Sequence, residues 1–256
     1  MSAIPPPAPD RPIVRVNMAM TADGKIATST RSVHTFGSPR DGRHLYQLRA
    51  GADAILCGAR TVEETGASLG NGGDAFTRKR VRDGRASHLL RVIVSGSASF
   101  SPRAALWNHR FSPIHLWVAP TAPTNRVARL RTLADDVWTS PVAPLDLRAG
   151  LEHLAAAHGI RTVIVEGGGG LNDALFRADL IDEVHLTLCP WIFGGRTAPT
   201  ISDGIGVQHL ADARSFHLVR TRRIDEEIFL LYRRTPGELP ALTPPSPPGP
   251  RRRPAA

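Results

Sequence analysis

A run of four glycines is the part of the sequence best suited to bind a charged ligand. Glu166 precedes the glycines of residues 167–170, and Leu171 and Asn172 follow them. Consecutive glycines let backbone N–H groups converge, and a helix that begins here adds a partial positive charge. The spacing matches neither the Walker A pattern nor the complete dinucleotide fingerprint. The run therefore predicts a site for a phosphate or pyrophosphate, with a tight turn that binds no ligand as the alternative.

A second candidate is the loop that follows the first apolar run, residues 20–27. It contains Asp23, Gly24 and Lys25, and Asp-Gly by itself signals only a turn. Lys25 is one of two lysines in the chain, and its ammonium can pair with a phosphate or donate a proton. A role in a site and a plain turn both remain open for this loop.

Gly58 and Thr61 follow another apolar run, residues 54–57. Residues beyond the end of a buried strand could face a cofactor, whereas Thr61 could instead cap a helix. The basic stretch 78–82 is a candidate surface for anions, with a solvated loop as its alternative.

Several other kinds of site are excluded by spacing. His153 and His158 stand five residues apart, so a helix does not present them on one face as zinc ligands. The signatures of zinc deaminases and of the hydrolase nucleophile elbow are absent from the sequence. Cys57 and Cys189 form neither a disulfide framework nor a metal-ligand pattern. We therefore expect no metal, and a reducing, cytoplasmic location.

The composition is typical of a globular chain rather than a membrane protein. Of the 256 residues, 41% are hydrophobic and 21% are charged. No apolar run approaches the roughly 18 residues that a membrane span needs. The formal net charge is +9, but only Lys25 and Lys79 among the 32 basic residues are lysines. This bias indicates GC-rich codons rather than a surface selected for nucleic acid, so a nucleic-acid partner is not expected.

Strands that alternate with helices must position these candidate sites. Apolar runs of strand length occur at residues 13–18, 54–57, 89–94, 114–118, 136–138, 162–165 and 184–188. Helical spacing of apolar residues occurs at 41–50, 124–133, 147–158 and 172–178. The runs 216–219 and 228–232 flank a charged turn and predict a hairpin. The pattern predicts an α/β fold with a mainly parallel central sheet, flanking helices and a C-terminal antiparallel hairpin.

One domain is predicted over residues 12–235. Residues 1–11 and 236–256 are rich in proline, so we expect two disordered tails, the second of which carries an arginine triplet at 251–253. Within the domain, the stretch 66–87 is expected to be irregular. Ligands of such a sheet bind beyond the carboxyl ends of its strands, where the glycine run and the Lys25 loop both fall.

Five motifs in order resemble the pyrimidine reductases of riboflavin biosynthesis. They are Met-Thr-Ala-Asp-Gly-Lys at 20–25, Leu-Arg-Ala at 48–50, Gly-x-x-Thr-Val at 58–62, Glu-Gly-Gly-Gly at 166–169, and Asp-Glu-Val with Pro-x-x-Phe-Gly-Gly within 182–195. This reductase domain is often fused to a zinc deaminase and has a dihydrofolate-reductase-like fold. The resemblance covers nearly all of residues 12–235.

The resemblance implies an NADPH-dependent reduction of a ribosylamino-pyrimidine 5′-phosphate to the ribitylamino product. Hydride would reach C1′ of an opened, imine-like ribose, and a proton would reach the nitrogen. Carried over by position, the implied NADPH-binding residues are Ala19, Thr61, Ser95, Gly168, Gly169, Gly170, Leu171 and Asn172. The implied substrate-binding residues are Arg49 and Glu166, and the implied catalytic residues are Asp23, Lys25 and Glu166. A homodimer is implied by the family alone.

One stretch departs from the family pattern. After Gly-x-x-Thr-Val the family shows an acidic pair, then Pro-x-Leu and a basic residue. Here Glu63 and Glu64 come two positions early, the proline is missing, and Gly72 stands at the basic position. Arg78 or Lys79 is an alternative source of the phosphate contact. Two other hypotheses therefore stay open: a reductase of the same fold acting on dihydrofolate or another pterin-like heterocycle, and a non-catalytic basic protein that binds nucleic acid.

Overall fold

The structure, a computed structural model, describes residues 10–31 and 36–234. The expected tails 1–11 and 236–256, with the arginine triplet, lie outside these ranges except for residues 10 and 11. Arg11, which the sequence assigns to the first tail, is buried, and its guanidinium donates to both carboxylate oxygens of Asp182 at 2.7 and 2.8 Å. The packed part of the chain therefore includes Arg11.

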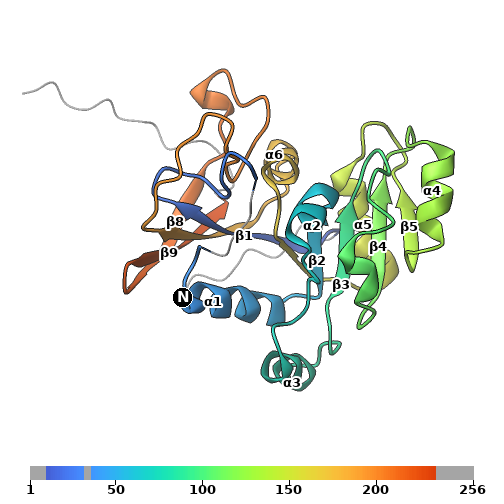
Figure 1. The fold of residues 1–256 in the computed structure, drawn as a ribbon, viewed down its shortest axis with the longest axis horizontal. Coiled ribbons are helices and arrows are strands. Elements are labelled where there is room, and N and C mark those ends of the chain that lie inside the picture. Colours follow the sequence, from blue (N-terminus) through green and yellow to red (C-terminus); the bar gives the residue numbers. More distant parts are fainter. Residues whose placement is uncertain (1–9, 32–35, 235–256) are drawn as a thin grey trace, which may run out of the picture.

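Nine strands in the described part of the chain form a single sheet (Figure 1). They are β1 (Ile13–Thr21), β2 (Ala54–Gly58), β3 (Leu90–Val94), β4 (Ile114–Val118), β5 (Asp136–Thr139), β6 (Thr162–Val165), β7 (Glu183–Cys189), β8 (Phe216–Ile224) and β9 (Glu227–Arg234). Their order across the sheet is β5-β4-β3-β2-β6-β1-β7-β9-β8. Strands β1 to β7 run parallel, whereas β9 is antiparallel to β7 and to β8. The predicted α/β fold with a C-terminal hairpin is confirmed.

The connections between strands hold the helices. These are α1 (Pro39–Ala50), α2 (Ala59–Thr65), α3 (Asp74–Arg82), α4 (Thr124–Arg131), α5 (Leu147–His158) and α6 (Gly169–Arg177), with 3₁₀ turns η1 (Ala105–Asn108) and η2 (Leu210–Asp212). None of the helices in the described ranges is long and apolar enough to span a bilayer.

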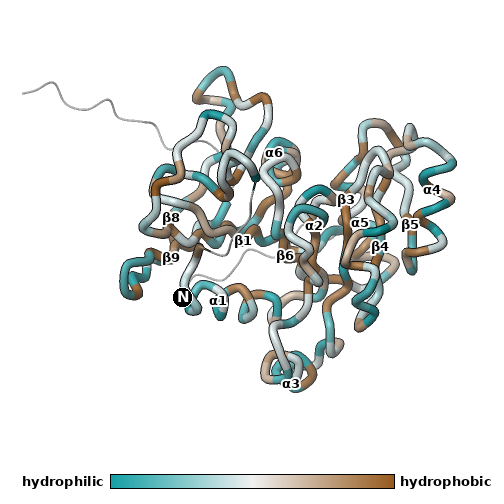
Figure 2. Tube along the Cα trace, viewed as in Figure 1, coloured by the Kyte–Doolittle hydropathy of each residue, from teal (hydrophilic) through white to brown (hydrophobic). Residues whose placement is uncertain are grey.

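The sheet is apolar on both faces, and each face has its own core. Leu56 of β2 packs with residues of α5 and α6, whereas its neighbour Ile55 packs with residues of α2 and α4. Successive side chains of a strand point to opposite faces, so a strand covered on both sides reads as an unbroken apolar run. Apolar colour accordingly follows the central strands in Figure 2. This double burial is the reason why the central strands can be found from the sequence.

The expectation of an irregular stretch at 66–87 is wrong, because α3 lies within it. This helix carries few apolar residues and is anchored by Arg80, which is fully buried. The guanidinium of Arg80 donates to the carbonyls of Arg49, Ala52 and Ala86 at 2.8, 2.5 and 3.0 Å. The basic stretch 78–82 is therefore a helix held by one buried arginine, and not a solvated loop.

Two other helix boundaries differ from expectation. Gly58 is the N-cap of α2, so Thr61 lies within the first turn and does not cap the helix. The last helix, α6, begins at Gly169, three residues before the expected start at Asn172, because the final two glycines of the run are already helical.

A close contact between α5 and β4 gives a test of this packing. A Cβ atom at Gly150 of α5 would lie 2.8 Å from the indole Cζ3 of buried Trp117, so Gly150→Ala overpacks the interface. We expect the free energy of unfolding to fall by about 1–3 kcal/mol in urea titrations. Gly42→Ala in α1 is the control, because nothing lies within 4 Å of its added Cβ. That variant should gain up to about 1 kcal/mol, and equal effects of the two substitutions would contradict the packing.

Candidate functional site

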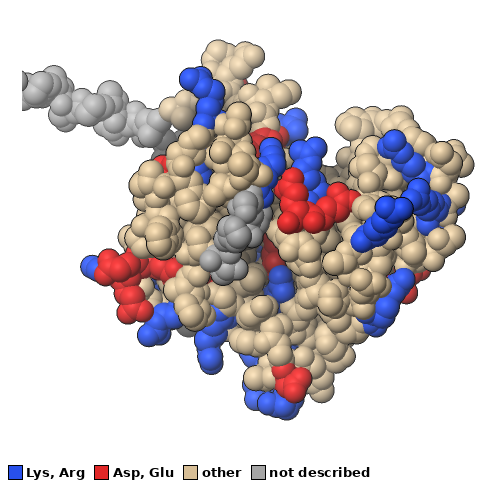
Figure 3. Space-filling view, viewed as in Figure 1, with Lys and Arg blue, Asp and Glu red and all other residues tan. Residues whose placement is uncertain are grey.

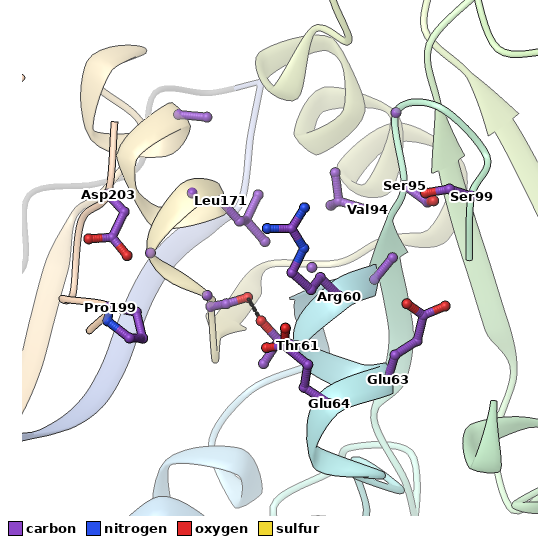
Figure 4. Close-up of a pocket in the computed structure, with 18 of the residues that line it drawn as sticks. Arg60, Thr61, Glu63, Glu64, Val94, Ser95, Ser99, Leu171, Pro199 and Asp203 are labelled. Atoms are coloured by element: carbon purple, nitrogen blue, oxygen red, sulfur yellow. Dashed lines mark hydrogen bonds between the residues drawn. The ribbon is translucent and has the colours of Figure 1, made fainter. Parts of the chain in front are cut away.

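A cleft of about 1210 Å³ opens at the carboxyl ends of β2, β3 and β6. Its lining comes from the residues that follow these strands, from α2 and from the start of α6 (Figure 4). In Figure 3 the same region is a hollow with acidic and basic side chains at its mouth. Parallel strands bring their carboxyl ends to one edge, which is why residues distant in sequence meet here.

The glycine run forms the floor of this cleft. Gly167 and Gly168 have φ values of +58° and +74°, a left-handed conformation that favours glycine. The carbonyl of Gly167 accepts hydrogen bonds from the amide of Gly58 at 3.0 Å and from the Thr61 hydroxyl at 3.3 Å. A Cβ at Gly168 would lie 2.4 Å from that hydroxyl oxygen. The run is therefore clamped against α2, and the first amides of α6 have no acceptor within the helix.

A buried ion pair stands behind the glycines. Arg49, at the end of α1, donates from Nε to Glu166 at 2.6 Å and from Nη2 to the other carboxylate oxygen, and its Nη1 donates to the carbonyl of Gly70. Burial lowers the pKa of Arg49, but the charge and hydrogen bonds of Glu166 outweigh burial and raise it. The arginine therefore stays charged, and Glu166, which lines the cleft, carries the matching carboxylate.

Cys57 lies beside this pair at the end of β2. Burial, followed by the nearby carboxylate of Glu166, raises the pKa of its thiol to about 12. The thiol is therefore protonated near neutral pH.

The loop of Asp23 and Lys25 is fastened to the segment after β7. Asp23 accepts hydrogen bonds from the Thr21 hydroxyl at 2.6 Å and from the amides of Phe193 and Gly194 at 3.1 and 2.7 Å. The Thr21 hydroxyl, followed by these amides, lowers the pKa of Asp23 to about 2. Lys25 donates from Nζ to the carbonyl of Ala198 at 3.3 Å. Neither side chain lies in the described lining of the cleft, which takes Ile26 and Ala27 from this loop.

The residues expected at a cofactor separate into two groups. Thr61, Ser95, Leu171 and the glycines 168–170 all line the cleft. Asn172 instead lies beneath the glycine run, fully buried, with its amide donating to the carbonyl of Ile201 at 2.8 Å. Ala19 lies in β1 beside Thr187 of β7, and the lining takes its neighbour Met18 instead.

Two arginines, Arg31 and Arg60, line the cleft but were not identified from the sequence. Arg60 is exposed at the start of α2 and points into the cleft in Figure 4, and Arg31 lies near the Lys25 loop. Arg60 lies two residues after Gly58, which ends β2, and this position after a buried strand is the signal that could have identified it. Arg31 follows Ser-Thr in a loop and carries no comparable signal.

The departure from the family pattern also has a structural account. Gly72 lies flat against the ring of Tyr46, since a Cβ there would come within 2.2 Å of the ring. Arg78 and Lys79 belong to α3, at the bottom of Figure 1 and away from α6, and Lys79 pairs with Asp83. Neither residue is part of the described lining of the cleft.

The chain is similar to known reductases over almost its whole described length. The family model of the RibD C-terminal domain matches residues 12–230. The 2,5-diamino-6-ribosylamino-4(3H)-pyrimidinone 5′-phosphate reductase of Methanothermobacter thermautotrophicus is 36% identical over 222 residues, which is 87% of this chain and 98% of that protein. The enzyme of the same name from Archaeoglobus fulgidus is 33% identical over 194 residues, 76% of this chain and 87% of that protein.

A solved structure has the same fold. A pyrimidine reductase-like protein of Corynebacterium diphtheriae matches with a TM-score of 0.73 at 19% identity, over 88% of this chain and 93% of that one. This likeness bears on the fold alone.

The buried pair can be tested through stability. Glu166→Ala leaves the guanidinium of Arg49 buried without its counter-charge, so we expect the free energy of unfolding to fall by about 3–5 kcal/mol in urea. Glu64→Ala, which removes an exposed glutamate from the same cleft, should change it by no more than about 0.5 kcal/mol. A similar stability for both variants would show that the pair does not hold the glycine run in place.

Proposed function

The chain belongs to the RibD C-terminal domain family of riboflavin biosynthesis reductases, and we propose that it uses NADPH to reduce 2,5-diamino-6-ribosylamino-4(3H)-pyrimidinone 5′-phosphate or the corresponding uracil compound. The observation that carries this proposal is the glycine run at the start of α6, open to a large cleft and adjoining the pair of Arg49 and Glu166. The product would be the ribitylamino compound.

The glycine run fits a cofactor pyrophosphate. An added Cβ at Gly168 would fill the space beside Thr61, whereas the position of Gly170 faces open space. The amide groups at a helix start favour anions, and α6 begins here. Thr61 on α2 and Ser95 after β3 supply hydroxyls to the lining from two separate elements (Figure 4). We therefore assign the pyrophosphate to residues 168–171 and the rest of the cofactor to the walls.

The positive charge that the phosphates need comes from Arg31 and Arg60, the basic side chains in the described lining. We assign the phosphate contacts to these two arginines in place of Arg78 and Lys79. In this proposal Asn172 does not touch the cofactor but supports the glycine run from below. Ala19 also does not touch it, and its place on β1 positions its neighbour Met18 in the lining.

The chemistry divides between the bound cofactor and the chain. When bound, NADPH supplies the hydride for C1′ of the opened ribose. Glu166, held by Arg49, orients the substrate by accepting hydrogen bonds from its hydroxyl or amino groups. Asp23 has a pKa of about 2 and carries no proton near neutrality, so it fixes its loop against the amides of Phe193 and Gly194. Lys25 is on the same loop, outside the described lining, with its Nζ at the carbonyl of Ala198, and we propose that it reaches the nitrogen as proton donor when substrate is bound.

We further propose a homodimer located in the cytoplasm. Exposed apolar side chains lie in the segment between β7 and β8, among them Ile192, Ile205 and Leu210, which are 73%, 89% and 63% exposed. Such residues on a folded surface suit contact with a second copy. The free thiols of Cys57 and Cys189 suit a reducing compartment.

The activity is tested with a substrate panel. The pure protein is mixed with NADPH or NADH and with the ribosylamino-pyrimidine phosphate or dihydrofolate, and oxidation of the nicotinamide is followed by absorbance. We expect turnover of the pyrimidine with NADPH. Gly168→Asp places a carboxylate in the phosphate cradle and should abolish NADPH binding in a chain that still folds. Turnover of dihydrofolate alone, or unchanged NADPH affinity in this variant, would refute the proposal.

The homodimer is tested by sedimentation. Changing Ile205 and Leu210 together to Asp should convert a dimer to a monomer, because two charges replace exposed apolar contacts. Val81→Asp, on α3, is the control and should leave the dimer intact, since Val81 is also 57% exposed but lies on another element. A parent chain that sediments as a monomer would rule out this surface as an interface.

A further inference from the structure

A cluster of histidines and one aspartate lies at the end of the sheet opposite the cleft. His115 is the second residue of β4 and Asp136 is the first residue of β5, and the parallel register pairs them directly. Paired residues of neighbouring strands point to the same face. His115 Nδ1 and Asp136 Oδ2 are 3.9 Å apart as a result.

The third member comes from the helix that covers this face. His158 is the last residue of α5, which ends at Gly159 in a left-handed conformation with its amide bonded to Leu154 and Ala155. This end fixes the backbone position of His158 beneath β4. The ring centroids of His115 and His158 are 4.8 Å apart at an interplanar angle of 63°.

The donor atoms of these three residues are close together but are not bonded to each other. One ligand atom from each of His115, Asp136 and His158 lies within 4.8 Å of the other two. Among the described residues, neither histidine ring has a hydrogen-bond partner, and 3.9 Å is too long for one between His115 and Asp136. His115 is 7% exposed, and no hydrogen bond to a described residue fixes its ring. A single ion placed between the three donor atoms would contact all of them.

The chemistry of the three side chains suits a cation. A neutral imidazole keeps a lone pair on one nitrogen, which is the form that binds metals. The carboxylate of Asp136 provides a negative charge beside the two rings.

We propose that His115, Asp136 and His158 bind a divalent transition metal ion such as Zn²⁺, with water in the remaining position. Two imidazoles and one carboxylate are ligands that Zn²⁺, Co²⁺, Ni²⁺ and Cu²⁺ accept, whereas Mg²⁺ and Ca²⁺ prefer oxygen. Bonds of about 2.1 Å place tetrahedral ligands about 3.4 Å apart, so the donors must draw together on binding. The side chains of Asp136 and His158 are exposed enough to turn toward His115.

The bound ion would join β4, β5 and α5 at the edge of the sheet. It would act as a structural link, because the cluster lies at the amino ends of strands whose carboxyl ends form the cleft. The proposal is independent of the reductase activity. The spacing of His153 and His158 did not predict it, since the partner of His158 is His115 on a strand and not a second histidine one helical turn away.

The test measures metal binding to the full-length chain without a histidine tag. Equilibrium dialysis against Zn²⁺, followed by metal analysis, should give one ion per chain, and Co²⁺ should give the visible absorption of a tetrahedral site. The melting temperature should rise with Zn²⁺. His158→Gln and Asp136→Asn should each weaken binding roughly tenfold or more, because each removes one ligand.

His217→Gln is the matched control, an exposed histidine on β8, and it should bind the ion as the parent does. Circular dichroism confirms that each variant is folded. Binding below one ion per chain in the parent, or undiminished binding in both His158→Gln and Asp136→Asn, would overturn the proposal. The reductase rate should be the same with and without a chelator, so the outcome does not depend on the activity.

Discussion

Arg49 donates from its guanidinium to Glu166 and to the carbonyl of Gly70, while its own carbonyl accepts from buried Arg80. One residue at the end of α1 therefore connects the segment that follows β6, the loop after α2 and helix α3. A guanidinium stays charged under all ordinary conditions and offers five donors in a fixed plane, so it can hold several elements at once. The geometry of the cleft depends on this buried charge having its carboxylate.

The glycine run depends on the same contact. Glu166 directly precedes Gly167, where the backbone becomes left-handed. The carbonyl of Gly167 accepts hydrogen bonds from the amide of Gly58 and the hydroxyl of Thr61. With that carbonyl turned toward α2, the start of α6 is directed at the cleft. A side chain at Gly168 would collide with Thr61, so the close approach of α2 and α6 and the need for glycine have one cause. Ion pair, turn and helix start act as one unit.

Different parts of the structure were accessible to sequence reasoning to different degrees. The central strands could be predicted because burial on both faces leaves an unbroken apolar run, as at residues 54–57. Helix α3 could not, because its attachment is the hydrogen bonding of Arg80 and not an apolar stripe. The family resemblance led to Thr61, Ser95 and the glycines in the cleft, but not to Arg60, whose place in the lining depends on the direction of α2. Likewise, His115 and His158 meet only through strand register and the end of α5.

The two outer strands of the sheet, within the described residues, are unlike each other. One edge is β5, only four residues long, and the other is β8, which is nine residues long and mostly exposed. A long open edge invites hydrogen bonding by strands of other molecules. On β8 this is opposed by Arg220, Arg222 and Arg223 and by an irregular register between Leu218 and Arg220. Part of the arginine excess thus has a physical use, because like charges along the last strand oppose its pairing with strands of other molecules.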